Sequence, residues 1–139
     1  FNGNPATMAG GVVMLDMLDE TAISKINQHG AKIREEVQNI ADDIDVPVTV
    51  TGEAYLFHIH FAEGPVTDFQ SAGPGLESTD QEGPNHPLAF YLAMRDRNIF
   101  MAPRGMGNIS TPMTGKDVNL FVEAAEGALT DVAEIASNS

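Results

Sequence analysis

Residues 1–11 read FNGNPATMAGG and combine a tight turn with the start of a slender helix. Asn4 is a favoured helix N-cap, and Pro5 suits the first helical position, where a missing amide donor costs nothing. Gly3 allows the backbone before the cap to adopt a positive φ angle. The stretch therefore predicts a helix that begins at Pro5.

The first turns of this helix carry several small residues. Each glycine costs a helix roughly 1 kcal/mol relative to alanine, so the sequence predicts that a large neighbour packs closely against it. A glycine-tolerant core helix that follows a loop is an alternative explanation, because a turn of the NGNP type is not specific. The small residues are Ala6, Ala9, Gly10 and Gly11.

The composition indicates one soluble domain. The chain has 139 residues, 42% of them hydrophobic, which is enough for one core and too few for two. The absence of cysteine excludes a disulfide framework and fits the cytoplasm. No apolar run approaches a bilayer span, and the start lacks the pattern of a signal peptide. We expect a cytoplasmic protein with no membrane partner.

The charge is strongly acidic. Twenty Asp and Glu residues face seven Lys and Arg residues, giving a formal net charge of −13. Phosphate backbones and anionic membranes would be repelled, which argues against nucleic acid as a partner. An acid-rich, lysine-poor surface is typical of proteins from salt-loving organisms, where salt screens the self-repulsion. An ordinary acidic cytosolic domain is the alternative.

Apolar residues at helical spacing predict helices over residues 5–18, 21–43, 87–98 and 114–136. The second helix gives the strongest signal, and Gly30 fills the one gap in its stripe. Thr114 and Asp117 predict a capping pair for the last helix. In the helix that begins at Pro87, the residues expected to be buried are Leu88, Tyr91, Leu92 and Met94.

Alternating residues predict a sheet beneath these helices. In residues 54–62 the odd-numbered side chains are apolar and form the floor for the second helix. Shorter strands are expected at 46–51, 99–102 and 108–110, and a long Gly- and Pro-rich connection at 63–84. The order of elements predicts an α/β (α+β-like) fold, a small and mostly antiparallel sheet covered on one side by helices.

The opening stretch resembles the segment T-[FL]-[SN]-G-N-P-x-[ST]-M-A-A-G of class III, pyridoxal-phosphate-dependent aminotransferases, in particular the glutamate-1-semialdehyde 2,1-aminomutase-like branch. The later run FMAP at 100–103, followed by Ser110 and the Thr-x-x-Asp helix start, is similar to the close of that family. The resemblance covers nearly the whole chain. It implies the C-terminal domain of a fold-type-I enzyme, with residues 1–20 as the loop and helix leading into it and residues 21–139 as the small domain.

The resemblance also implies what lies elsewhere. The family's Schiff-base lysine precedes this segment, and so does a threonine that reaches the cofactor phosphate of the neighbouring subunit. We therefore expect a homodimeric enzyme in which a large domain holds the pyridoxal phosphate, with a small amino acid or amine as substrate. The isolated chain is expected to be inactive and to hold no catalytic residue.

Four residues are candidates for contact with cofactor or substrate. The resemblance places Asn2 and Gly3 near the neighbour's phosphate. Arg104, in a Gly-flanked turn, could fork onto a substrate carboxylate or pair with a surface acid. Glu53 stands where the family often has serine beside the substrate channel, and a carboxylate there would favour a cationic or polar group; a plain exposed strand acid is the alternative.

His58 and His60 share one strand face and form half of a possible metal site. Nothing else in the sequence has the spacing of metal ligands, so we expect no bound metal. The nucleotide, phosphate-loop and hydrolase motifs are also absent.

A stand-alone acidic binding module without catalysis is the second hypothesis. It predicts that the chain itself covers its first helix, with the face of Ala6, Ala9 and Gly10 buried. The aminotransferase hypothesis predicts that this face needs a partner.

Overall fold

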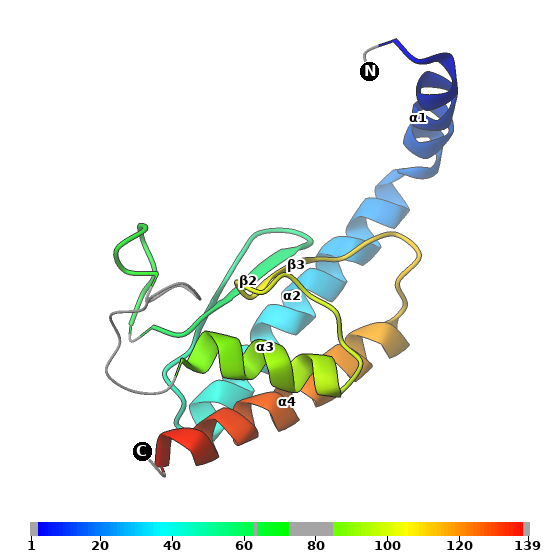
Figure 1. Ribbon diagram of the computed structural model, residues 1–139. Coiled ribbons are helices and arrows are strands. Elements are labelled where there is room, and N and C mark those ends of the chain that lie inside the picture. Colours follow the sequence, from blue (N-terminus) through cyan, green and yellow to red (C-terminus); the bar gives the residue numbers. More distant parts are fainter. Residues whose placement is uncertain (1–2, 63, 73–84, 138–139) are drawn as a thin grey trace.

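The computed structural model describes residues 3–62, 64–72 and 85–137. Within these residues the helices and antiparallel strands confirm the expected fold class (Figure 1). The elements are α1 (Pro5–Met17), α2 (Glu20–Asp43), β1 (Thr49–Thr51), β2 (Leu56–His60), α3 (His86–Asp96), β3 (Met106–Asn108) and α4 (Gly115–Ser137).

The three strands form one sheet in the order β1-β2-β3, with antiparallel neighbours. Of the odd-numbered side chains, Phe57, Ile59 and Phe61 are buried as the alternation predicts, whereas Tyr55 is exposed. The ring of Phe57 meets Phe121 of α4 edge-on, with centroids 5.1 Å apart. Helices α2 and α4 pack against each other, and α3 packs on α4 (Figure 1). The core therefore lies between one sheet face and these helices.

Helix α2 connects the sheet to the rest of the core. Four of its buried residues belong to the predicted stripe, namely Ile26, Gly30, Ile33 and Val37, and Ala41 is buried as well. Gly30 lies against the turn that joins β1 to β2, where a Cβ atom would clash with the Ala54 carbonyl oxygen and come within 2.8 Å of Tyr55 Cα. The glycine is thus required for this close approach.

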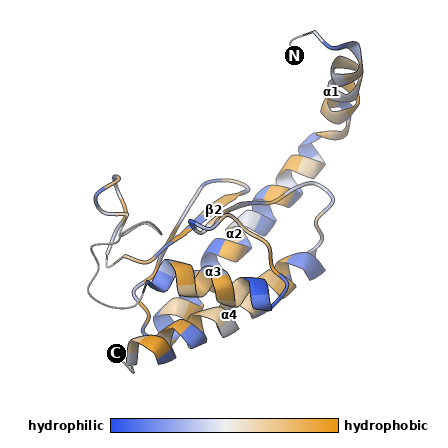
Figure 2. Cartoon of the chain, viewed as in Figure 1, coloured by the Kyte–Doolittle hydropathy of each residue, from blue (hydrophilic) through white to orange (hydrophobic). Residues whose placement is uncertain are grey.

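Helix α1 begins at Pro5 as predicted, but it stands apart from the body (Figure 1). Asn4 caps it, accepting hydrogen bonds from the amides of Ala6 (2.9 Å) and Thr7 (3.4 Å). None of its residues is buried, although many of them are hydrophobic (Figure 2). The exposed ones are Met8, Val12, Val13, Met14, Leu15 and Met17. In the part of the chain described here, no helix is long and apolar enough to cross a membrane.

The strand predicted at residues 99–102 is not formed. Asn98 ends α3 with a positive φ of 62°, and the Ile99 amide donates back to the Met94 carbonyl (3.0 Å). This helix-ending bond uses the donor that a strand would need. Phe100 is then 85% exposed, with the Arg95 guanidinium 5.9 Å from its ring centroid.

The predicted buried face of α3 is partly wrong. Met94 is buried, but Leu88 and Leu92 are 41% and 45% exposed. Phe90 and Ala93 take the inner positions. The predicted stripe was therefore rotated relative to the face that meets α4.

The predicted cap of α4 is confirmed. The Thr114 amide and hydroxyl both donate to Asp117 Oδ2, each over 2.7 Å. These hydrogen bonds hold the pKa of Asp117 below its ordinary value, and the bond from the hydroxyl has the largest effect.

Replacing Gly30 with alanine tests the contact between α2 and the turn. We expect Gly30→Ala to lower the free energy of unfolding by about 1–3 kcal/mol, because the new methyl group meets backbone atoms that cannot move aside. Gly10→Ala is the matched control, since a Cβ there has nothing within 4 Å. It should leave stability unchanged or raise it by up to about 1 kcal/mol. Urea unfolding followed by circular dichroism measures both; equal effects would contradict the contact.

Candidate functional site

Arg104 lies in the exposed turn that precedes β3. The turn closes with a hydrogen bond from the Gly105 amide to the Ala102 carbonyl (3.0 Å). Gly105 has a φ of 81°, and a Cβ there would clash with the Ile59 carbonyl oxygen. The Ile59 amide in turn donates to the Gly105 carbonyl (3.0 Å). Glycine thus brings the Arg104 turn directly against β2.

His58 makes a further bond to this turn. Its Nε2 atom lies 2.7 Å from the Arg104 carbonyl oxygen. A carbonyl only accepts, so His58 Nε2 must carry the hydrogen. The ring of His58 stacks on that of His60, with centroids 3.7 Å apart. The sequence placed both histidines on one strand face but gave no sign of this bond.

His60 is the more deeply placed member of the pair and is only 8% exposed. Its Nε2 is hydrogen-bonded with the Thr51 hydroxyl (2.9 Å) across the β1–β2 pairing. Burial lowers the pKa of His60, and charge on His58 lowers it further, against a smaller opposing effect of a backbone hydrogen bond with Ala72. Burial and the neighbouring His58 therefore favour the neutral form of His60.

Glu53 is exposed in the turn between β1 and β2, and its carbonyl accepts from the Leu56 amide (2.9 Å). Arg34 of α2 holds this turn, donating from Nη1 to the carbonyls of Ala54 and Leu56, each over 2.7 Å. The sequence alone did not identify Arg34 as a residue that binds this turn. Its position four residues after Gly30 was the available signal.

The structure does not bring Glu53 and Arg104 together. Glu53 precedes the first residue of β2, whereas the Arg104 turn bonds to Ile59 near its last. About 13 Å of strand separates these two ends. Glu53 and Arg104 therefore lie at different ends of the sheet.

Of the predicted cofactor residues, Asn2 lies outside the described residues. Gly3 has the predicted positive φ, 81°, but is exposed, with nothing within 4 Å of a Cβ position. It lies at the far end of α1, away from the strands (Figure 1).

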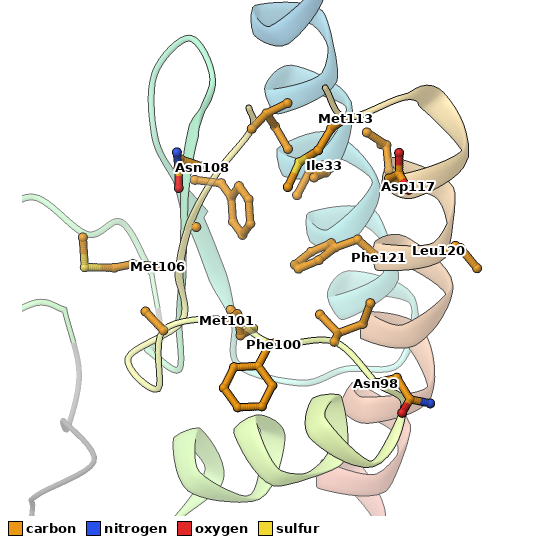
Figure 3. Close-up of a pocket in the computed structure, with 16 residues that line it drawn as sticks. Ile33, Asn98, Phe100, Met101, Met106, Asn108, Met113, Asp117, Leu120 and Phe121 are labelled. Atoms are coloured by element: carbon orange, nitrogen blue, oxygen red, sulfur yellow. The ribbon is translucent and has the colours of Figure 1, made fainter. Parts of the chain in front are cut away.

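A cavity of about 500 Å³ runs along the β3 edge of the sheet (Figure 3). Its lining comes from residues 98–102, from β3 and from the first turns of α4, and it includes Phe57 and Ile33. Apolar side chains predominate, and its one acidic lining residue, Asp117, is already bonded to Thr114. The cavity suits an apolar group. No group of three or more His, Asp or Glu residues with metal-site geometry occurs in the described ranges.

No family model matches the chain, but it resembles known proteins in sequence and in fold. It is 27% identical to the glutamate-1-semialdehyde 2,1-aminomutase of Methanosphaera stadtmanae over 132 residues, 94% of this chain and 30% of that protein. It is 32% identical to the enzyme of the same name from Methanothrix thermoacetophila over 103 residues, 74% of this chain and 22% of that one.

Among solved structures, an omega-transaminase from Sphaerobacter thermophilus matches with a TM-score of 0.83 and 29% identity, covering 94% of this chain and 28% of that one. A glutamate-1-semialdehyde aminomutase from Pseudomonas aeruginosa shares the fold, with a TM-score of 0.67 over 83% of this chain and 24% of that one. The predicted resemblance to class III pyridoxal-phosphate-dependent aminotransferases is confirmed. The chain spans 22–30% of the length of the curated relatives it matches.

The lowered pKa of His60 predicts a pH dependence of stability. Between pH 7 and pH 5 the unfolded chain, with an ordinary His pKa of 6.5, takes up a proton that folded His60 resists, so the free energy of unfolding should fall as pH falls. The lowered pKa of Asp117 acts near and below 3.8, outside this window.

His60→Gln removes the titrating group and keeps a nitrogen at the same reach. Its unfolding free energy should fall less steeply than that of the wild type between pH 7 and pH 5. Urea titrations at several pH values measure both slopes, and the two curves should run parallel above pH 7. Parallel curves below pH 7 as well would contradict the assignment.

Proposed function

We propose that this chain is the C-terminal portion of a pyridoxal-phosphate-dependent class III aminotransferase or aminomutase-like enzyme. The observation that carries the proposal is the match to the omega-transaminase, because it combines fold and sequence over almost all of this chain. The match covers about a quarter of that enzyme, so the rest of the active site belongs to the remainder of the protein.

Pyridoxal phosphate, when bound, supplies the electron sink for amino-group transfer. Because the match covers only about a quarter of the omega-transaminase, we place the cofactor, and the lysine that holds it, on a preceding large domain. On this basis the isolated chain has no activity. Its part is to close the substrate channel and orient the substrate.

Arg104 is our candidate for orienting the substrate. Its exposed turn is fixed at Gly105 and at its own carbonyl, so the side chain leaves the sheet from a defined point. A guanidinium there can bind a substrate carboxylate through two parallel hydrogen bonds. Glu53, at the other end of β2, would favour a cationic or polar group and disfavour a second carboxylate.

We place α1 at the junction with the large domain and with the second subunit of a homodimer. In this arrangement residues 1–20 lead into the small domain of residues 21–139, and Asn2 and Gly3 approach the neighbour's cofactor phosphate. The exposed apolar side chains of α1 support this placement. The acidic surface suits the salt-rich cytoplasm of a halophile.

The stand-alone module has no comparable support. It required the face of Ala6, Ala9 and Gly10 to be buried by the chain itself, and all three residues are exposed.

The first test is the visible spectrum of the whole enzyme that contains this chain. Added pyridoxal phosphate should give the absorbance band of the protein-bound cofactor, and the band should bleach or shift with glutamate-1-semialdehyde or a simple amine donor. The 139-residue chain alone should give neither change. A folded whole enzyme that shows no band would overturn the proposal.

The role of Arg104 is tested with two amine donors of similar size. Alanine and isopropylamine differ in that alanine has a carboxylate where isopropylamine has a methyl group. A hydrogen-bonded charge pair is worth about 1.5–3 kcal/mol, so Arg104→Gln should raise the ratio of KM for alanine to KM for isopropylamine by about ten- to a hundredfold. Arg104→Lys should raise the ratio less, since it keeps the charge but loses the fork. An unchanged ratio in Arg104→Gln would show that Arg104 does not bind the carboxylate.

A further inference from the structure

The turn that carries Arg104 is attached to the sheet by two kinds of bond. Backbone bonds join Gly105 to Ala102 and to Ile59, and no side-chain atom takes part in them. The bond from His58 Nε2 to the Arg104 carbonyl is different, because a side chain makes it. It joins residues 46 positions apart in the sequence.

His58 is itself held in place. On one side its ring stacks on His60, which is nearly buried and bonded to Thr51. Cross-strand pairing sets Thr51 opposite His58, so the two histidines and the threonine lie on one face of the β1–β2 pair. The His58 ring is therefore anchored on its own sheet before it reaches the turn.

We propose that His58 is a positioning residue for Arg104, an inference that rests on the proposed function of that arginine. By holding the Arg104 carbonyl, His58 fixes the backbone from which the guanidinium extends toward a carboxylate-bearing substrate. Both the neutral Nε2–H tautomer and the imidazolium donate from this atom, so the contact does not depend on the charge of His58. Loss of the bond would let the turn shift, and small shifts of substrate-orienting groups reduce binding in the reactive pose.

The position of the donor atom makes the proposal testable. Glutamine places its amide nitrogen four bonds from Cα, as histidine places Nε2. Asparagine places its nitrogen one bond nearer, at the level of Nδ1. His58→Gln can therefore replace the bond, whereas His58→Asn and His58→Ala cannot.

In the whole enzyme, His58→Asn and His58→Ala should raise the ratio of KM for alanine to KM for isopropylamine by roughly two- to tenfold, the equivalent of one hydrogen bond. KM for alanine should change more than kcat. His58→Gln should bring the ratio back toward the wild-type value, and His29→Gln on α2 is the control for loss of a histidine elsewhere. Equal effects of His58→Asn and His58→Gln, or no effect of either, would overturn the proposal. In that case an altered KM ratio in Arg104→Gln would still support the role of the arginine.

Nuclear magnetic resonance of the 139-residue chain tests the bond itself without the cofactor. The His58 ring should carry its hydrogen on Nε2, and the carbonyl carbon resonance of Arg104 should move in His58→Asn and return in His58→Gln. Hydrogen on Nδ1 alone would overturn the positioning role whatever the kinetics show. If Arg104→Gln leaves the KM ratio unchanged, the proposed function of Arg104 fails and the functional part of this inference fails with it.

Discussion

The close packing of α2 on the β1–β2 hairpin is the constraint on which the rest of the structure depends. Gly30 allows the backbone of α2 to contact the turn between β1 and β2. Arg34, four residues later on the same helix face, donates hydrogen bonds to two carbonyls at that hairpin turn. One turn further, Gln38 bonds to the edge strand, donating to the Val48 carbonyl (3.0 Å) and accepting from the Val50 amide (2.8 Å). A single helix face thus satisfies backbone groups that an edge strand would leave open. The register of β1 against β2 follows from these contacts.

Once β2 is fixed, its alternation divides the domain into two sides. Phe57 and Ile59 enter the core, where the Phe57 ring lies over Gly107 so closely that a Cβ there would clash. His58 and His60 point to the opposite face, which carries the Arg104 turn. Core and candidate site are therefore two faces of the same five-residue strand. A shift of the strand register by one residue would move the core side chains to the site face and the histidines into the core. The candidate site therefore depends on the same strand register as the core.

Elements with a strong local signal were predictable from the sequence. The cap at Asn4, the stripe of α2 and the alternation of β2 each follow from a few neighbouring residues. The segment after α3 was not predictable in this way, because Asn98 adopts a positive φ and the strand expected at residues 99–102 does not form. The arginine turn was identified, but its bond to His58 was not, since 46 residues separate the partners and no periodicity links them. Local sequence patterns predicted which residues are candidates for the site, and only the packing showed which of them are in contact.

Helix α1 differs from α2 in how its apolar residues are distributed. In α2 the apolar residues fall on one face and are buried, which is how a helix gains stability from its own domain. In α1 they are spread around the helix, from Val12 and Val13 to Leu15, and all remain exposed. A helix that is apolar on all sides is stable only when it is surrounded. Gly10 and Gly11 of α1 have no neighbouring atoms within 4 Å of a Cβ position in this chain. They would allow another backbone to approach α1 as closely as Gly30 allows the hairpin to approach α2. The domain of α2, α3 and α4 completes its own core, and in the enzyme that we propose, α1 carries the surface through which that domain joins the large domain.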